Sequence, residues 1–294
     1  MTNKKQTIRQ LVIYILLSFG IPFILVFLYI ANFGWTTDND WYSPLVSFVM
    51  LCPMAANILT HVITKEGTEN LCLRIKIKGN IRYFAVALIF PFICGIIIAV
   101  LASLMIFPEN SLINMAEHFK TTDFLVMCPY LAAVTMASVF QGFGEEFGWR
   151  AYMMPKLEKL MPLPAAIIVG GIIWGLWHAP IIACGHNFGT GYTGYPWLGI
   201  ALMCISCICL GTYLTALTKA SKSVIPAALA HIAVNNICGS VSGTMLSYID
   251  IPETTLAQLN AEFSHSLLFM IVVSASALTT GVLILVKNKK NTNK

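Results

Sequence analysis

Two adjacent carboxylates near the middle of the chain could activate a water molecule. Glu145 and Glu146 follow a long apolar run, and Arg150 comes four residues after Glu146. Residues four apart lie on the same face of a helix, so Arg150 can pair with Glu146. Successive residues of a helix are rotated by about 100°, so Glu145 points in another direction. We predict a supporting Glu146–Arg150 pair, with Glu145 facing the bundle interior. The alternative is a charged end of an ordinary helix.

Two imidazoles and a carboxamide interrupt other apolar segments. His178 follows Trp174 by four residues, and Asn235 follows His231 by four. The spacing places His231 and Asn235 on one helix face, in a region where polar groups need partners. Each group alone is also typical of a hydrogen bond that holds membrane helices together.

Together these side chains are suited to hydrolysis. A buried glutamate can take a proton from water. An imidazole can orient that water or protonate the leaving amine. Histidine and asparagine donors can stabilise the oxyanion of a tetrahedral intermediate.

The composition indicates an integral membrane protein. Of 294 residues, 57% are hydrophobic and 11% charged, whereas a soluble domain carries roughly 25% charged residues. A spanning helix needs about 20 mostly apolar residues. The segments that qualify are 11–31, 43–63, 83–107, 124–144, 164–182, 196–218, 223–241 and 265–286. The sequence predicts an all-α polytopic bundle of about eight transmembrane helices. It forms a single membrane domain, 1–294, with a cavity between the fourth, fifth and seventh spans.

The basic residues predict how the chain is oriented. All of the 18 Lys and Arg residues except Lys120 lie near the termini or in alternate loops. The positive-inside rule then places both termini in the cytoplasm. The net charge of +5 follows from this topology and does not indicate nucleic-acid binding. The basic N-terminus runs into an apolar stretch too long for a signal peptide, which predicts a retained first helix.

Two further features concern cysteines and one loop. The nine cysteines lie mostly in apolar runs and lack zinc-site spacing, so we expect free thiols that pack between helices. The loop 184–195 is rich in glycine and aromatic residues. It predicts either a re-entrant segment or a cap over a cavity.

The three polar motifs resemble the signature of the CPBP family. This family contains the CAAX prenyl proteases of the Ras-converting type and the bacteriocin-processing or abortive-infection (Abi) membrane proteins. The motifs are Glu145-Glu146-x-x-x-Arg150, Trp174-x-x-x-His178 and His231-x-x-x-Asn235, within a catalytic core at 124–241. Ala151 and Trp174 stand where the family usually has Gly and Phe. Every polar position is intact.

The resemblance implies an intramembrane endopeptidase. By it, Glu145 with His178 activates water, His231 with Asn235 forms the oxyanion site, and Glu146 and Arg150 support them. The implied partner is a peptide or lipidated protein, either a CAAX-type prenylated protein or a bacteriocin or other peptide precursor. Short cytoplasmic loops favour a prokaryotic member, in a bacterial cytoplasmic membrane.

The cofactor is left open by the resemblance. Family members are often labelled metalloproteases, and a metal-free glutamate mechanism has also been argued. Glu145, His178 and His231 would form a zinc set with an open position for water. A His-Glu-x-x-His motif that would strengthen that case is missing from the sequence. We therefore favour glutamate-activated water without a metal.

Two other classes of function compete. One is a non-catalytic membrane scaffold or bacteriocin self-immunity protein, which keeps the fold without turnover. The other is a transporter that uses the buried carboxylate and histidines as a proton relay. The order of the motifs favours the protease, and no visible inverted repeat supports the transporter.

The depth of Glu145 conflicts with these predictions. At about 1.5 Å per residue, His231 lies roughly 12 Å along its segment and His178 about 21 Å along its own. Glu145 follows the end of segment 124–144 and is therefore shallower than both. The side chains can meet if the fourth segment is longer and deeper, the fifth is tilted, or the cavity funnels inward.

Overall fold

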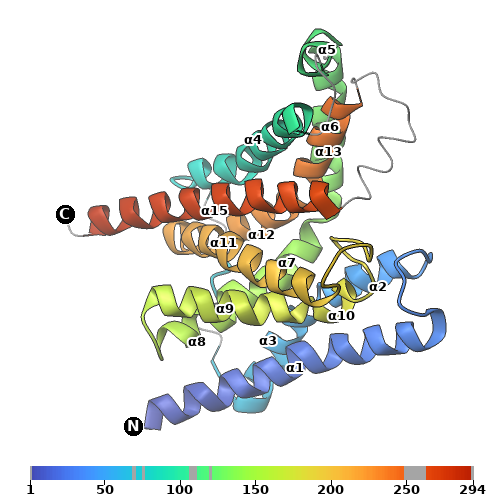
Figure 1. The fold of residues 1–294 in the computed structure, drawn as a ribbon. Coiled ribbons are helices and arrows are strands. Elements are labelled where there is room, and N and C mark those ends of the chain that lie inside the picture. The colour runs from blue at the N-terminus through green and yellow to red at the C-terminus, as the bar shows by residue number, and fades with distance from the viewer. Residues whose placement is uncertain are drawn as a thin grey trace.

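The computed structural model describes residues 2–67, 71–74, 77–105, 111–118, 121–247 and 263–292. Within these ranges every regular element is a helix, which confirms the all-α prediction (Figure 1). In chain order they are α1 Thr2–Phe33, α2 Tyr42–Val49, α3 Cys52–Thr64, α4 Ile81–Met105, α5 Ser111–His118, α6 Thr121–Ala137, α7 Val139–Gly148, the π-helix η1 Trp149–Met153, α8 Met154–Glu158, α9 Leu163–Trp177, α10 Ala179–Ile182, α11 Trp197–Ser221, α12 Ile225–Ala233, the π-helix η2 Val234–Cys238, α13 Gly239–Leu246 and α15 Phe263–Thr292.

The chain is a polytopic membrane bundle. In the described part of the chain, six helical stretches are long and apolar enough to cross a membrane: Lys4–Phe33, Tyr42–Thr64, Ile81–Met105, Trp197–Ser221, Ile225–Leu246 and Ser266–Lys290. Leu125–Ala137 and Val139–Glu158 together make a seventh, bent by 48°. The predicted segment 164–182 falls on α9, which has only 15 residues. The eight predicted segments are thus helical, but only six to seven are spans by length.

The fourth predicted segment, 124–144, ends too early. The chain bends at Ser138, whose hydroxyl donates to the Val134 carbonyl oxygen at 2.9 Å, and side-chain bonds of this kind often bend helices. Helix then continues through α7, η1 and α8 to Glu158. Glu145 consequently lies well inside a helical stretch. A longer fourth segment is one of the arrangements that let Glu145 meet the other polar side chains.

Proline explains why α9 stops at Trp177. Pro180 has no N–H to donate to the carbonyl of Leu176 four residues earlier, so a regular helix cannot pass through it. His178 therefore lies at the break, as the last flanking residue of α9 and the first of α10. The break gives its side chain a position that a continuous helix would not.

Glycines bring the helices of the central bundle into close contact. A Cβ on Gly142 would lie 2.7 Å from a backbone oxygen of α12. A Cβ on Gly171 or Gly175 would lie 2.6 or 2.4 Å from Cα atoms of α11. Small residues at such crossings let membrane helices approach closely. They hold α7 against α12, and α9 against α11, which also packs on α15.

The positions of the termini and the state of the cysteines agree with two of the sequence-based predictions. α1 begins and α15 ends on the same side of the bundle (Figure 1). Which side of the membrane this is stays a prediction. All nine cysteines are free thiols, five of them buried, as expected for packing residues.

Candidate active site

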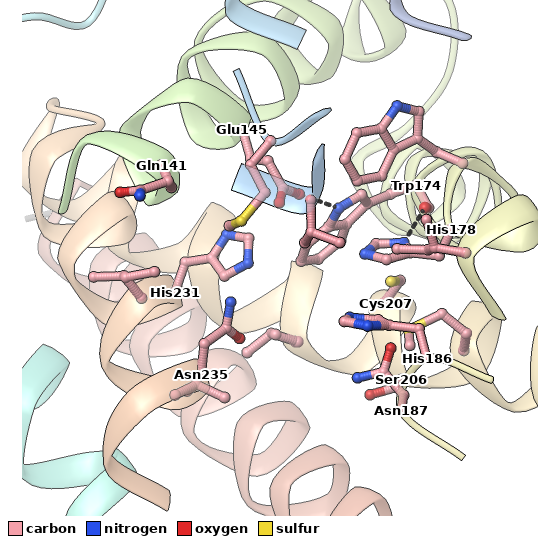
Figure 2. A pocket seen from close by; sticks show the side chains of 18 of the residues that line it. Gln141, Glu145, Trp174, His178, His186, Asn187, Ser206, Cys207, His231 and Asn235 are labelled. Atoms are coloured by element: carbon pink, nitrogen blue, oxygen red, sulfur yellow. Dashed lines mark hydrogen bonds between the residues drawn. The ribbon is translucent and has the colours of Figure 1, made fainter. Parts of the chain in front are cut away.

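A cavity of about 570 Å³ lies inside the bundle. The predicted catalytic residues Glu145, His178, His231 and Asn235 all line it (Figure 2). The fourth, fifth and seventh predicted segments therefore meet there. Residues of α2, α11 and α15 complete the walls, and sequence reasoning missed those contributions.

Glu145 is buried with 2% of its surface exposed, although it borders the cavity. Its Oε2 accepts hydrogen bonds from the indole N–H groups of Trp174, at 2.8 Å, and Trp149, at 3.3 Å. Neither donor carries a charge. Glu145 points into the bundle, as predicted. Neutral hydrogen bonds, and not an ion pair, hold its carboxylate in place.

Glu146 makes the predicted pair with Arg150 and one contact that was not predicted. The Arg150 Nε lies 3.1 Å from Glu146 Oε2, and its Nη1 donates to Oε1 at 3.2 Å. The His231 Nδ1 lies 2.8 Å from the same Oε1. Because an ionised carboxylate oxygen only accepts, Nδ1 carries the hydrogen. Glu146 is fully buried and thus connects α7, η1 and α12.

His178 is oriented by the backbone of its own helix. Its Nδ1 lies 2.9 Å from the Trp174 carbonyl oxygen. A carbonyl can only accept, so Nδ1 bears the hydrogen and Nε2 is the ring nitrogen left for chemistry. Figure 2 shows His178 across the cavity from His231.

His231 and Asn235 present their polar groups to the same cavity, as their spacing predicted. His231 is 4% exposed, and its bond to Glu146 likewise leaves Nε2 available. Asn235 is exposed and belongs to η2. π-Helical turns occur frequently at functional sites because they re-aim side chains. The other π-helix, η1, contains Arg150.

Trp174 is the residue whose role sequence reasoning missed. Its N–H holds Glu145, the Arg150 guanidinium carbon lies 4.1 Å from its ring centroid, and the His231 ring contacts it edge-on at 5.3 Å. Trp174 therefore contacts Glu145 directly and also contacts both partners of Glu146. The signal was present as the departure from the Phe usual in the family, because Phe has no N–H to donate.

The loop 184–195 contributes to the far end of the cavity. His186, Asn187 and Phe188 line it. Figure 2 shows His186 and Asn187 opposite Glu145 and His231. This position agrees with the predicted cap. Burial lowers the pKa of His186 to about 4, so its ring is neutral at pH 7. The far end of the cavity thus offers uncharged hydrogen-bonding groups.

The fit of a metal can be tested on the donor set. In the part of the chain that the structure describes, no three His, Cys, Asp or Glu side chains are grouped so as to hold a metal ion. In the conditional zinc set, Oε1 of Glu145 and the Nε2 atoms of His178 and His231 carry no hydrogen bond to another described residue, but the three side chains are not grouped around one point. These residues do not fit a metal centre, and the mechanism below uses none.

Comparison with known proteins points to one family. Residues 128–237 match the model of the family described as Type II CAAX prenyl endopeptidase Rce1-like. The matched region contains all three polar motifs. The chain is also 26% identical over 235 residues to CAAX prenyl protease 2 of Methanococcus maripaludis, covering 76% of this chain and 82% of that protein.

Proposed function

We propose that the chain is a CPBP-type intramembrane endopeptidase that hydrolyses a peptide bond with water activated by Glu145. One observation carries this assignment. The Glu145 carboxylate borders the cavity and is held at one oxygen by two neutral N–H donors. Among the described residues no cation is bonded to either oxygen, so the carboxylate retains the basicity that an ion pair would reduce. A general base needs that basicity.

Each step uses groups that line the cavity. Glu145 takes a proton from water as the water oxygen attacks the carbonyl carbon. The carbonyl π electrons move to the oxygen, which becomes an oxyanion that Asn235 and His231 stabilise by donating hydrogen bonds. The oxyanion electrons then re-form the carbonyl as the C–N bond breaks, and the leaving amine takes from Glu145 the proton that came from water. The unprotonated Nε2 of His178 can accept a hydrogen bond from the attacking water and orient it.

The protonation of His231 follows from its partner. Its Nδ1 hydrogen faces Glu146, so Nε2 can donate to an oxyanion only when the ring carries both protons. The Glu146 carboxylate supplies the counter-charge for that imidazolium. Arg150 in turn holds Glu146 in place. Glu146 and Arg150 are therefore positioning residues.

We propose a prenylated, CAAX-type peptide as the substrate class. The description of the matched family and the name of the Methanococcus relative both support it. We also propose a prokaryotic cytoplasmic membrane as the location, with both termini in the cytoplasm. The segregation of the basic residues supports that orientation.

A cleavage assay tests the proposal. The purified chain in liposomes is incubated with a prenylated CAAX peptide, the same peptide without its lipid, and an unlipidated hydrophobic precursor peptide. Mass spectrometry identifies the bond that is cut. We expect the prenylated peptide to be cleaved fastest, and Glu145→Gln to slow cleavage about 1,000-fold. Faster cleavage of the precursor peptide would overturn the substrate class. Cleavage that Glu145→Gln leaves intact would overturn the mechanism.

A further inference from the structure

Two carboxamides in the cavity wall have polar atoms without a partner. The Oε1 of Gln141 and the Nδ2 of Asn236 are buried, and neither has a hydrogen bond among the described residues. Both residues line the cavity that contains Glu145. A buried donor or acceptor without a partner costs free energy, so native proteins seldom keep one unless something else satisfies it.

The two amides flank the proposed catalytic groups. Gln141 lies one helical turn before Glu145 on α7, and Asn236 follows Asn235 directly in η2. Figure 2 shows Gln141 on the same side of Glu145 as His231, away from His178. Both amide side chains therefore belong to the wall of the cavity that contains the proposed catalytic groups.

A neighbouring polar residue shows that the wall is not simply short of partners. Ser138 lines the same cavity one turn before Gln141 and Gly142. Its hydroxyl donates to the Val134 carbonyl oxygen at 2.9 Å. The local backbone thus satisfies the hydroxyl, whereas the buried atoms of the two amides have no such bond to any described residue.

The unpartnered pair consists of one acceptor and one donor. An extended peptide offers the complementary pair, a backbone N–H and a backbone C=O, at every residue. We propose that Gln141 and Asn236 bind the main chain of the substrate beside the cleaved bond. Gln141 Oε1 accepts a substrate N–H, and Asn236 Nδ2 donates to a substrate carbonyl oxygen. This inference rests on the proposed protease function, and it makes recognition there independent of the substrate's side chains.

The proposal is tested by removing one hydrogen bond in two ways, by deleting the N–H of the peptide and by deleting the Gln141 acceptor of the enzyme. The probe is a prenylated CAAX peptide, in its parent form and with a single N-methyl group at each position near the cleaved bond. The enzymes are the wild type, Gln141→Met, which keeps the shape without the acceptor, and Ser138→Ala as the matched control. We expect one N-methyl position to reduce wild-type kcat/KM about tenfold, mainly through KM. The same N-methyl group should leave kcat/KM of Gln141→Met unchanged. Ser138→Ala, whatever its rate on the parent peptide, should lose the same factor as the wild type on N-methylation.

A second pair of variants keeps the test decisive. Gln141→Glu retains an acceptor and should keep the N-methyl effect. Asn236→Leu should raise KM about tenfold while remaining sensitive to that N-methyl group. Equal N-methyl effects in the wild type and Gln141→Met at every position would overturn the proposal, with water then satisfying the amide. Failure of the protease function looks different, because the wild type would not cleave or Glu145→Gln would cleave equally well.

Discussion

Two carboxylates of this chain, the partly buried Glu66 and the buried Glu145, have opposite surroundings. Glu66 follows α3 and forms an ion pair with Lys156 of α8. It also accepts hydrogen bonds from Tyr152, at 2.6 Å, and Thr64, at 2.8 Å. Lys156 donates in addition to Gln10 of α1, at 2.7 Å. Burial alone would raise the pKa of Glu66, but the hydrogen bonds from Lys156, Tyr152 and Thr64 outweigh it and lower that pKa.

Glu145 has none of these direct ionic partners in the described residues. Two indole N–H groups meet at one of its oxygens, and it borders the cavity, which Glu66 does not. Glu146 resembles Glu66, although it is the next residue to Glu145, because the Arg150 guanidinium and the His231 ring contact its carboxylate. The contrast teaches that burial does not mark a reactive carboxylate. A carboxylate that neutral donors hold beside a cavity remains available as a base, whereas a paired one stabilises the fold.

The largest expected effect is on stability, at Glu146. Glu146→Gln removes one partner of a buried ion pair and leaves the Arg150 guanidinium, 4% exposed, without its counter-charge. Breaking such a pair costs about 3–5 kcal/mol. The unfolding temperature of Glu146→Gln in detergent should therefore be well below that of Glu66→Gln. Unfolding of Glu146→Gln at the wild-type temperature would remove the distinction between Glu145 and Glu146.

The next effect is on turnover, at Trp174. Trp174→Phe keeps an aromatic ring beside Arg150 and His231 but removes the N–H that holds Glu145. We expect kcat to fall about tenfold with KM unchanged, because the base is less well positioned while the substrate site is intact. Steady-state kinetics in liposomes measure both values. Trp149→Phe should cost less, since its N–H is 3.3 Å away. A larger loss from Trp149→Phe would contradict the assignment.

A smaller and pH-dependent effect belongs to Glu66. Because the folded state lowers its pKa, its stabilisation is complete above the unfolded value of about 4.3 and is lost as pH falls through the lower folded pKa. Glu66→Gln should reduce the free energy of unfolding by about 1 kcal/mol at pH 7. The difference should disappear in acid. Denaturation at both pH values measures it, and a difference that persists in acid would show that the carboxylate charge is not what matters.

The smallest expected effect is that of a chelator. The donors of Glu145, His178 and His231 are not grouped for a metal ion. Adding a chelator to the liposome assay should change kcat/KM by less than about twofold, whereas loss of a catalytic metal would remove far more. Activity that is lost with chelator and restored by zinc would require those residues to rearrange around a metal.

Spacing along one helix was a sound basis for predicting which polar side chains lie together. Four-residue intervals predicted the Glu146–Arg150 pair and the common face of His231 and Asn235, because helix geometry fixes which residues are neighbours. The apolar runs predicted the membrane helices for the same kind of reason. The predicted fourth segment ended before Glu145 because a hydropathy scale scores Glu145 and Glu146 as polar, whatever their partners in the folded protein.

Contacts between helices could not be predicted in this way. His231 meets Glu146 from 85 residues away, and Trp174 meets Glu145 from 29. Such pairs depend on how each helix is rotated and how closely it packs. Glycines such as Gly142 and Gly175 set those approaches through backbone contacts that their spacing does not specify.

The most direct test compares Glu145→Gln with Glu66→Gln on one prenylated CAAX peptide in the same liposomes. Single-turnover cleavage rates are measured at pH 7 for both variants and the wild type. The account predicts a loss of about 1,000-fold for Glu145→Gln, as expected when a general base is removed. It predicts a rate within about threefold of wild type for Glu66→Gln, since a partnered carboxylate remote from the cavity affects only stability. Equal losses in the two variants, or a wild-type rate in Glu145→Gln, would contradict it.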